Sequence, residues 1–366
     1  MTDNKAMQRI WKLLFYLAIF PATLGLSGWQ GWAWWSWASA PPVESTSTQS
    51  SPDTDKTVQI RIPSGTSATQ IGQDLAAAGL IRSAEAWNIW VRWLSVQDKA
   101  GFKAGTYQLS PTKSLPEIAA AITTGNEVQR SFTIPEGWSL KQMAAYFESQ
   151  GFFSARDFMA AANRVPRDRF PWLPSGIPQL EGFLYPDTYQ VAAGTVTPNS
   201  VIDQMLKRFE QVALPVYQTS PQKSLFTLLQ WVTLASVVEK EAVIPVERPR
   251  IAGVFIKRLR QGMKLESDPT VEYGLGVQQT PDRPLTLNQV NTPNPYNTYL
   301  NRGLPPTPIA SPGLASLQAT LSSEKTDYLF FVARYDGSHV FSRTLAEHQA
   351  AVLAIRKQRA ARRQGV

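Results

Sequence analysis

The sequence predicts an α+β protein: an N-terminal transmembrane helix, a small strand-and-helix unit, and then a larger mixed α+β domain. Three observations support this class. A chain of 366 residues is long enough for two or three domains. Its apolar fraction of 43%, with 12 Trp, 16 Phe and 11 Tyr, can fill substantial cores. A strand, turn and helix pattern occurs twice, while 27 Pro and 22 Gly indicate long ordered loops rather than a plain helical bundle.

The N-terminal segment is predicted to anchor the protein in a membrane. Residues 13–43 contain no charge, and their first half is strongly apolar. A helix needs about 20 such residues to cross a bilayer. Lys5, Arg9 and Lys12 precede the apolar run, and a cluster of tryptophans ends it, as expected at a membrane surface. We therefore predict a single pass through the plasma (inner) membrane, with a cytoplasmic N-terminus and an extracytoplasmic body.

The string "ASA" at residues 38–40 leaves a cleaved signal peptide as the alternative. The apolar region is longer than the about 15 residues of a usual signal core, and Pro41 would hinder cleavage because it lacks an N–H and fixes φ. We therefore favour the anchor. The polar residues up to 57, rich in Pro, Ser and Thr, are predicted to be a flexible linker.

An internal repeat follows the linker. "IPSGTSATQIGQDLAAAGLI" (62–81) matches "IPEGWSLKQMAAYFESQGFF" (134–153). Each copy predicts a short strand, a turn and a helix, with Ser67 or Ser139 as N-cap and Gly79 or Gly151 at the end. A unit this small buries little alone, so we expect the first copy to pair with "GTYQLS" (105–110) and the helix "LPEIAAAITTG".

The first copy and its added strand and helix, residues 58–126, resemble the small glycan-binding module called LysM. That module consists of two strands and two helices. A purely structural spacer is an equally open interpretation of this unit.

Composition excludes several classes of function. The net charge of +8 is concentrated at the chain ends: residues 1–12 carry +2 and residues 356–366 carry +5, which leaves +1 for the body. No nucleic-acid surface is implied. The chain has no Cys and only two His, which excludes thiol chemistry and disfavours zinc sites. We expect no cofactor and no metal.

The string "VVEKEA" (237–242) carries two carboxylates at the end of an apolar run. Residues 225–238 are apolar on all sides, which predicts a buried helix. Glu239 and Glu241 lie about 200° apart around such a helix, so one is expected to face the site and the other to pack or pair with Arg248 or Arg250. Burial and the negative helix end would both raise the pKa of a glutamate here, which suits a general acid.

Five strings in order carry a resemblance to a known family: "LEGFLYPDTYQ" (180–190), "ASVVEKEA" (235–242), "VFIKRLRQGMKLESDPTVEYGLG" (254–276), "YNTYLNRGLPPTPIASPG" (296–313) and "HVFSRTLAEHQ" (339–349). In this order they resemble the bacterial endolytic peptidoglycan transglycosylases of the MltG/YceG-like family. The resemblance covers nearly the whole chain from the apolar segment to about residue 350.

The resemblance implies an enzyme of cell-wall biogenesis. It would cleave the bond between N-acetylmuramic acid and N-acetylglucosamine in nascent glycan strands and leave a 1,6-anhydro end. It implies Glu241, the second glutamate of the E-K-E string, as the catalytic acid. Peptidoglycan synthases are implied as partners beside the glycan strands and the membrane.

The predicted organisation is a cytoplasmic N-terminus (1–12), a transmembrane helix (13–37), a linker (38–57), a LysM-like domain (58–126), a catalytic domain (127–355) and a basic tail (356–366). We expect substrate contacts from the strings of the catalytic domain. The candidates are Glu181, Asp187, Glu239, Asp268, Thr270, Tyr273, Asn297 and Tyr299.

Several of these candidates also have a structural interpretation. The segment "EGFLYPDTY" could be the wall of a sugar groove, or a turn-rich core segment in which Glu181 and Asp187 satisfy backbone amides. Asp268, followed by Pro269, predicts a helix N-cap, which is compatible with a place beside the substrate. The string "YNTYLNRGLPPTPI" predicts a loop whose polar groups could bind N-acetyl or hydroxyl groups.

Two other functions stay open. The first is a non-catalytic glycan-binding scaffold, which would not need two glutamates at the tip of a buried helix. The second is a hydrolase that uses Glu181 together with Glu241, because a hydrolase needs a second carboxylate about 5 to 9.5 Å away. Reaction products separate these alternatives. His339 and His348 are expected to be structural.

Overall fold

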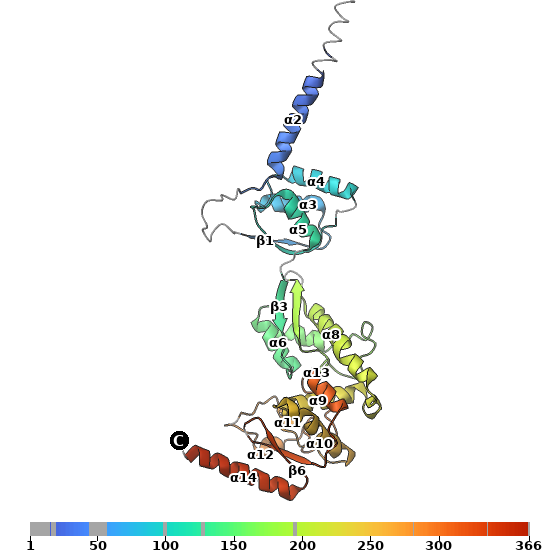
Figure 1. Ribbon diagram of the computed structural model, residues 1–366, viewed down its shortest axis with the longest axis vertical. Helices are drawn as coiled ribbons and strands as arrows, with labels where there is room; N and C mark the ends of the chain where they lie inside the picture. Colours follow the sequence, from blue (N-terminus) through green and yellow to red (C-terminus); the bar gives the residue numbers. More distant parts are fainter. Residues whose placement is uncertain are drawn as a thin grey trace, which may run out of the picture. The chain divides into compact units, whose positions relative to one another are not determined.

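The computed structural model describes residue 15 and residues 20–43, 57–97, 101–125, 129–192, 196–280, 282–334 and 336–364. The chain divides into two compact units, Met1–Arg130 with Gln190–Thr195, and Ser131–Tyr189 with Val196–Val366. Helices predominate, and the strands of the described residues form three two-stranded sheets (Figure 1). The predicted α+β class is confirmed at this level.

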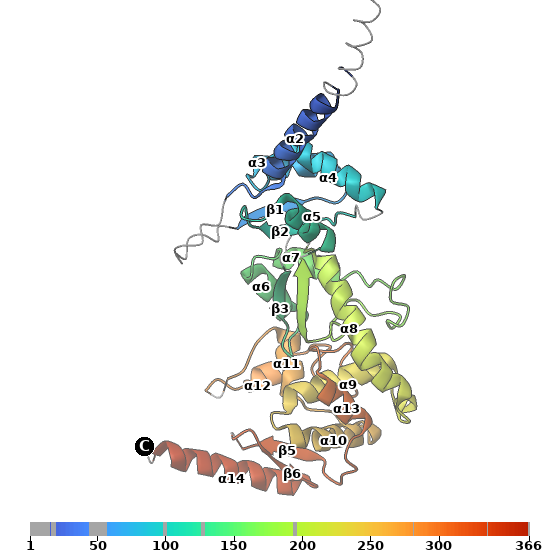
Figure 2. The same cartoon turned by 45° about the horizontal axis from the view of Figure 1, so that its top comes forward.

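Among its described residues, the first unit contains α2 (Phe20–Ser39), β1 (Val58–Ile62), α3 (Ala68–Ala77), α4 (Ala84–Val96), β2 (Gly105–Leu109) and α5 (Leu115–Thr124). Strand β1 runs antiparallel to β2 with Ile60 opposite Tyr107, as the sequence predicted (Figure 2). The core between the sheet and the helices contains the fully buried Trp87 and Tyr107. The C-terminal end of α2 joins this core through Ala38, and Trp35 stacks on Trp90 of α4.

The predicted membrane span receives no support from helix hydropathy. Within the described residues, no helix combines the length and the apolar character that crossing a membrane requires. Helix α2 covers residues 20–37 of the predicted span, whereas residues 13, 14 and 16–19 lie outside the described part of the chain. The predicted cytoplasmic segment 1–12 also lies outside it, as do residues 44–56 of the predicted linker.

The repeated strand, turn and helix is confirmed in both copies. Ser67 caps α3 and Ser139 caps α6 (Leu140–Ser149), each by accepting a hydrogen bond from a backbone N–H three residues later. Gly79 and Gly151 follow the two helices with φ of +69° and +67°, a conformation that favours glycine. The strands of the two copies have different partners: β1 pairs with β2, whereas β3 (Gln129–Thr133) pairs with β4 (Thr188–Ala192).

The second unit is mainly helical. After α6 it contains α7 (Ala155–Ala162), α8 (Pro198–Thr219), η2 (Lys223–Leu225), α9 (Leu228–Glu241), η3 (Pro245–Glu247), α10 (Arg248–Arg260), α11 (Asp268–Leu275), α12 (Leu287–Val290), α13 (Leu314–Leu321), the antiparallel hairpin β5 (Phe330–Ala333) and β6 (His339–Ser342), and α14 (Leu345–Gln364). Helix α14 includes most of the predicted basic tail.

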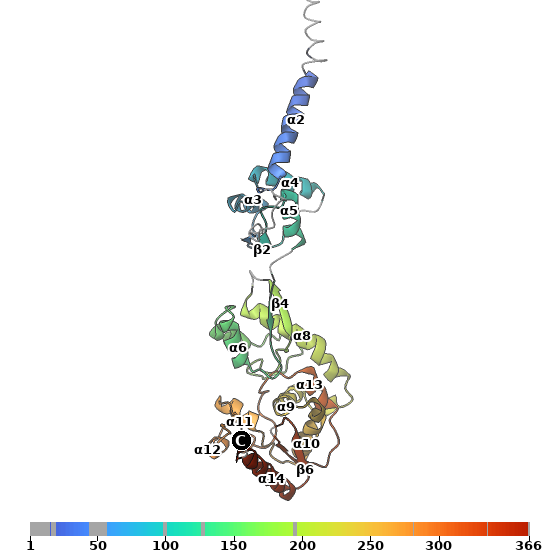
Figure 3. The ribbon, with the colours of Figure 1, turned by 60° about the vertical axis from the view of Figure 1, so that its left-hand side comes forward.

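Helix α9 lies at the centre of this unit, packed by α10, α11 and α13 (Figure 3). Thr227 begins it with a capping box to Gln230. Every residue from 231 to 238 is buried, so no face of the helix is left to solvent. The indole of Trp231 donates to the carbonyl of Leu317 in α13 at 3.0 Å. The predicted buried helix is confirmed, and it starts three residues later than expected, at Leu228.

Candidate active site

Glu241 is the last residue of α9, where the buried helix reaches the surface of the core. Glu241 is only partly accessible to solvent. The Ser267 hydroxyl donates a hydrogen bond of 2.6 Å to Glu241 Oε1. Oε2 has no hydrogen-bond partner within the described residues. One carboxyl oxygen is therefore fixed, and the other is available to a ligand.

The surroundings of Glu241 favour its protonated form. Burial raises the pKa of Glu241 to about 7, the Ser267 hydrogen bond lowers it, and the charges of Asp268 and Glu272 raise it further. The negative end of the α9 dipole acts in the same direction as these carboxylates. A carboxyl group with this pKa still holds a proton near neutral pH, as a general acid must.

Glu239 takes the other side of the helix, as the spacing predicted. Glu239 Oε1 lies 3.6 Å from Arg248 Nη2, which confirms pairing with one of the two arginines proposed. Glu239 Oε2 accepts the N–H of Gly313 at 3.1 Å. Its carboxylate also raises the pKa of nearby Glu136, after burial, which is the larger cause. Glu239 therefore ties the end of α9 to α10 and to the start of α13.

Three more polar residues lie near Glu241: Ser267 at the start of α11, and Asp268 and Glu272 within this helix. The sequence predicted Asp268 as N-cap, but the helix begins one residue earlier: Ser267 is the N-cap and Asp268 is the first helical residue. The hydroxyl of Ser267 makes no hydrogen bond to the backbone of α11, and it donates to Glu241. Asp268 instead accepts hydrogen bonds from Tyr299 Oη at 2.7 Å and from Gln279 Nε2 at 3.2 Å.

Glu272 lies one turn further along α11 and accepts the N–H of Gln279 at 2.6 Å. Burial raises its pKa, the Gln279 N–H lowers it, Lys240 lowers it, and Asp268 raises it. The charges of Asp268 and Glu272 both act on Glu241, so the three carboxyl groups form one electrostatic cluster. Burial likewise raises the pKa of Tyr299, and the negative charge of Asp268 raises it further, so its phenol stays protonated.

Thr270 and Asn297 are buried, and both make hydrogen bonds with the loop that follows α12 or with residues next to it. Thr270 Oγ1 donates to the carbonyl of Ser267 at 2.6 Å and lies 2.9 Å from Thr298 Oγ1. The amide nitrogen of Asn297 donates to two carbonyls, those of Val290 and Thr292. The predicted loop is confirmed, and both side chains stabilise it. Their contact with substrate stays a prediction.

Glu181 is buried, with only 1% of its surface exposed. It accepts the N–H of Leu140, at the start of α6, at 3.0 Å and the phenol of Tyr273 at 2.9 Å. Burial raises its pKa to about 7, while the hydrogen bonds from Tyr273 and Leu140 lower it. Burial also raises the pKa of Tyr273, and Glu181 adds to this rise. Glu181 therefore connects α6 to α11 inside the fold.

The rest of the "EGFLYPDTY" segment is core. Phe183, Tyr185 and Tyr189 are buried, and Tyr189 stacks on Phe132 of β3. Asp187 pairs with Arg208 at 2.7 Å and accepts the N–H of Thr188. The structural interpretation of this segment, in which its carboxylates satisfy amides and a cation, is the one the geometry favours. A substrate contact of Asp187 stays a prediction.

The two histidines lie in the C-terminal hairpin region. The imidazole Nδ1 of His339 is 2.8 Å from Glu247 Oε2. His348 of α14 stacks on Phe330 of β5. Burial lowers the pKa of His348. Both contacts are those of packed side chains, and neither histidine contacts Glu241.

Three residues of the Glu241 surroundings were not among the predicted site residues: Ser267, Glu272 and Gln279. Ser267 and Glu272 lie in the string "SDPTVEYGLG", on either side of predicted site residues. Helical spacing could therefore have indicated that both lie near the same site. Gln279 lies beyond the helix in a loop, and no periodic signal marks it.

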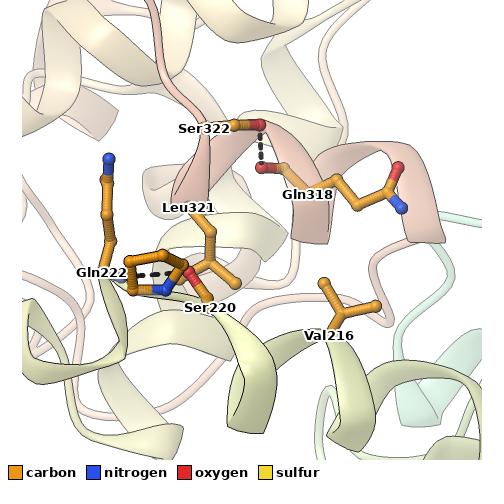
Figure 4. Close-up of a pocket in the computed structure, with 7 residues that line it drawn as sticks. Val216, Ser220, Gln222, Gln318, Leu321 and Ser322 are labelled. Atoms are coloured by element: carbon orange, nitrogen blue, oxygen red, sulfur yellow. Dashed lines mark hydrogen bonds between the residues drawn. The ribbon is translucent and has the colours of Figure 1, made fainter.

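An open pocket of about 410 Å³ lies elsewhere in the second unit, between α8 and α13 (Figure 4). Val216, Pro221 and Leu321 give it apolar surface, and Ser220, Gln222, Gln318 and Ser322 complete its lining. It contains none of the carboxyl groups described above.

Known proteins are similar to this chain over most of its length. The YceG-like family matches residues 60–354. A protein of Bacillus subtilis named endolytic murein transglycosylase is 33% identical over 312 residues, which are 82% of this chain and 85% of that protein. A Streptococcus pneumoniae protein of the same name is 31% identical over 80% of this chain, which spans 58% of that protein's length.

A crystal structure of a yceG-like protein from Listeria monocytogenes is also similar. It matches with a TM-score of 0.54 and 32% identity, covering 81% of this chain and 99% of that one. The matched region contains Glu241 and every polar residue placed around it. The chain therefore belongs to the YceG-like family.

Proposed function

We propose that this protein is an endolytic lytic transglycosylase that cuts the glycan strands of peptidoglycan with Glu241 as its catalytic acid. The observation that carries the proposal is the partly accessible Glu241 at the end of a buried helix, with one carboxyl oxygen held by Ser267 and a pKa raised to about 7. Relatives that cover most of the chain are named endolytic murein transglycosylases, which gives the substrate class. Cleavage at the bond between N-acetylmuramic acid and N-acetylglucosamine would shorten nascent strands.

In the first half of the reaction, Glu241 gives its proton to the glycosidic oxygen. The bond from that oxygen to the anomeric carbon of the muramic acid breaks, and positive charge develops on the sugar ring. The newly formed Glu241 carboxylate provides negative charge close to that ring. The N-acetylglucosamine leaves with the proton on its oxygen.

In the second half, the Glu241 carboxylate accepts the proton of the sugar's own 6-hydroxyl while that oxygen bonds to the anomeric carbon. The product is the 1,6-anhydro ring, and Glu241 regains its proton. One carboxyl group therefore serves as acid and then as base, and no water is consumed. A pKa of about 7 suits both roles, because neither protonation state is strongly disfavoured at neutral pH.

The hydrolytic alternative needs a second carboxylate that can reach substrate or water. Glu181 was the candidate, but it is buried and bonded to Leu140 and Tyr273. We infer that Glu181 holds α6 against α11 and takes no part in proton transfer. Buried Thr270 and Asn297 similarly hold the loop. The predicted contacts that retain partial exposure are Asp187, Glu239, Asp268, Tyr273 and Tyr299.

The direct test is the variant Glu241→Gln, assayed on purified glycan strands. We expect at least a 100-fold loss of strand cleavage, because general acid catalysis contributes about 100- to 10,000-fold. Glu324→Gln is the matched control: it neutralises a glutamate that pairs with Arg250 at 3.0 Å, away from the site. Full activity of Glu241→Gln with an intact fold would refute the assignment.

We further propose that residues 13–37 attach the enzyme to the plasma membrane and keep its body outside the cytoplasm. Support comes from the charge-free sequence and from exposed apolar side chains on α2, including Leu24, Leu26, Trp29 and Trp32. In cell fractionation, the full chain is expected in the membrane pellet after alkaline extraction. Replacing Leu24 and Leu26 by Arg should release it, and a wild-type chain found in the soluble fraction would contradict the anchor.

For the first unit we propose glycan binding in the manner of the LysM module that it resembles. Its two strands and the helices α3 and α5 supply the elements of that module. The test is sedimentation of the Glu241→Gln chain with insoluble peptidoglycan, with and without residues 58–126. Equal sedimentation of both chains would identify the unit as a spacer. Contact with peptidoglycan synthases is proposed from the family resemblance alone.

A further inference from the structure

Ser267 differs from most of the Ser and Thr helix N-caps of the described residues, with Ser114 of α5 as the other exception. Where Ser or Thr caps α3, α4, α6, α7, α8, α9 or α12, its side chain accepts a hydrogen bond from the backbone three residues later. Ser267 caps α11 without that bond. Its hydroxyl donates instead to Glu241 Oε1 at 2.6 Å. The side chain of Ser267 is therefore bonded to the proposed acid and not to the backbone of its own helix.

The backbone of Ser267 is fixed on both sides. Its N–H donates to Thr298 Oγ1 at 3.0 Å. Its carbonyl accepts the N–H of Thr270 at 3.2 Å and the hydroxyl of Thr270 at 2.6 Å. The residue is 1% exposed. Its hydroxyl is therefore aimed at Glu241 by a buried network with little freedom to move.

The residue before Ser267 adds a second, independent observation. Glu266 has φ of +56° and is the only non-glycine residue with positive φ in the described part of the chain. Arg258 holds it there: Nη2 lies 2.5 Å from Glu266 Oε2, and Nη1 donates to the carbonyl of Leu265 at 2.9 Å. Such conformations persist only where surrounding contacts enforce them, and they concentrate at functional sites. The strained turn delivers Ser267 to Glu241.

We propose that Ser267 is a positioning residue that fixes the orientation of the Glu241 carboxyl group during catalysis. A hydroxyl that donates to Oε1 makes that oxygen the acceptor, so the transferable proton lies on Oε2, which has no partner in the described residues. When Oε2 has given its proton to the glycosidic oxygen, the same hydroxyl stabilises the carboxylate until it accepts the proton of the 6-hydroxyl. The inference rests on the proposed role of Glu241.

The test compares Ser267→Ala with Ser267→Thr in the full chain, on purified glycan strands. For Ser267→Ala we expect kcat to fall at least 10-fold with little change in KM, because the acid is present but its direction is not fixed. The pH at which activity declines on the alkaline side should rise, because the Ser267 hydrogen bond lowers the pKa of Glu241. Ser267→Thr keeps the hydroxyl and should retain both kcat and the wild-type pH profile.

The other groups that face Glu241 are unchanged in these variants, which makes the pH shift specific. They are Asp268 and Glu272 from α11 and Tyr299 from the loop after α12. Ser316→Ala is the control for loss of a buried hydroxyl: Ser316 Oγ in α13 is buried and makes no hydrogen bond. This control should keep wild-type kcat and pH profile.

Failure of the inference can be told apart from failure of the proposed function. If Glu241→Gln is inactive while folded Ser267→Ala shows wild-type kcat and pH profile, the positioning role is overturned and the acid assignment stands. If Glu241→Gln is active, the proposed function itself fails. Should Ser267→Ala not fold, Ser267→Cys carries the test, because a thiol is a weak donor of similar shape. Wild-type kcat in the folded Cys variant would equally overturn the role.

Discussion

At the scale of single residues, the two glutamates of "VVEKEA" show how two positions on one helix end acquire different chemistry. Glu239 is bound by Arg248 and by the N–H of Gly313. Glu241 has two carboxylates beside it and no cation in direct contact within the described residues. The same residue type therefore makes structural contacts at one position and is the proposed proton donor at the other.

The pH dependence of the reaction follows from this difference. Glu241 must be protonated when it meets the substrate, and its pKa is raised to about 7. We expect kcat/KM to fall as pH rises through about 7. Initial rates of strand cleavage from pH 5 to 9 check this prediction. Activity that keeps rising to pH 9 would show that another group supplies the proton.

Glu181 predicts a pH effect on stability. Its pKa is raised from an ordinary 4.5 to about 7, so the folded state binds its proton more tightly than the unfolded chain does. Stability from this group is therefore lost as pH rises from about 4.5 to about 7, by about 3 kcal/mol. In urea unfolding at pH 5 and pH 8, Glu181→Gln should lose less stability than wild type. Equal losses would contradict an ionisable buried Glu181.

The sequence carried enough information to predict much of the site at this scale. The E-K-E spacing and the apolar run before it predicted that one glutamate would have a raised pKa and that the other would pair with an arginine, and the family resemblance assigned the first role to Glu241. The Ser267 hydrogen bond was not predictable, because Asp268 followed by Pro269 is an equally good helix start one residue later. The hydrogen bond from Ser267 depends on where the fold places Glu241, which the local sequence around Ser267 does not indicate.

At the scale of elements, the site depends on how closely α10 packs beside α9 and the segment after α13. Gly253 lies inside α10, and a Cβ there would be 2.2 Å from the backbone carbonyl oxygen of Glu324. A backbone atom cannot rotate away as a side chain can. The glycine therefore permits the close approach that keeps this layer compact.

Gly253→Ala is expected to destabilise the fold, although alanine favours helix by about 1 kcal/mol over glycine. The clash requires a shift of α10 or of the segment at Glu324, at a cost of about 1 to 3 kcal/mol. Thermal unfolding of the variant should show a lower midpoint than wild type. A higher midpoint would mean that helix propensity outweighs packing here.

Local sequence signals predicted where helices and strands lie in the chain better than they predicted which elements contact each other. Ser67, Ser139, Gly79 and Gly151 marked helix ends correctly because capping is local. The pairing of β3 with β4 was not predictable, since the partner lies more than 50 residues later and the first copy of the repeat pairs differently. The aromatic residues Phe183, Tyr185 and Tyr189 belong to the core that this pairing creates.

At the scale of the whole molecule, the chain contains two compact units with separate cores. Trp87 is fully buried in the first, where its indole donates to the carbonyl of Ala68 at 2.8 Å. Trp231 is fully buried in the second, within helix α9, which ends at Glu241. The repeated strand and helix thus serve two different cores.

Separate cores predict separate unfolding transitions in calorimetry. Replacing either tryptophan by alanine should cost about 3 to 5 kcal/mol in its own unit. Trp87→Ala is expected to lower the midpoint of one transition and Trp231→Ala that of the other. Each variant is therefore the control for the other. A single transition that both variants lower equally would show that the units unfold together.

The central claim is that one carboxyl group, that of Glu241, cuts the glycan without using water. Digestion of glycan strands in water enriched in oxygen-18, followed by mass spectrometry of the new ends, tests it most directly. The account predicts 1,6-anhydro ends that contain no oxygen-18 and no cutting by Glu241→Gln. Reducing ends that carry oxygen-18 would show hydrolysis and contradict it.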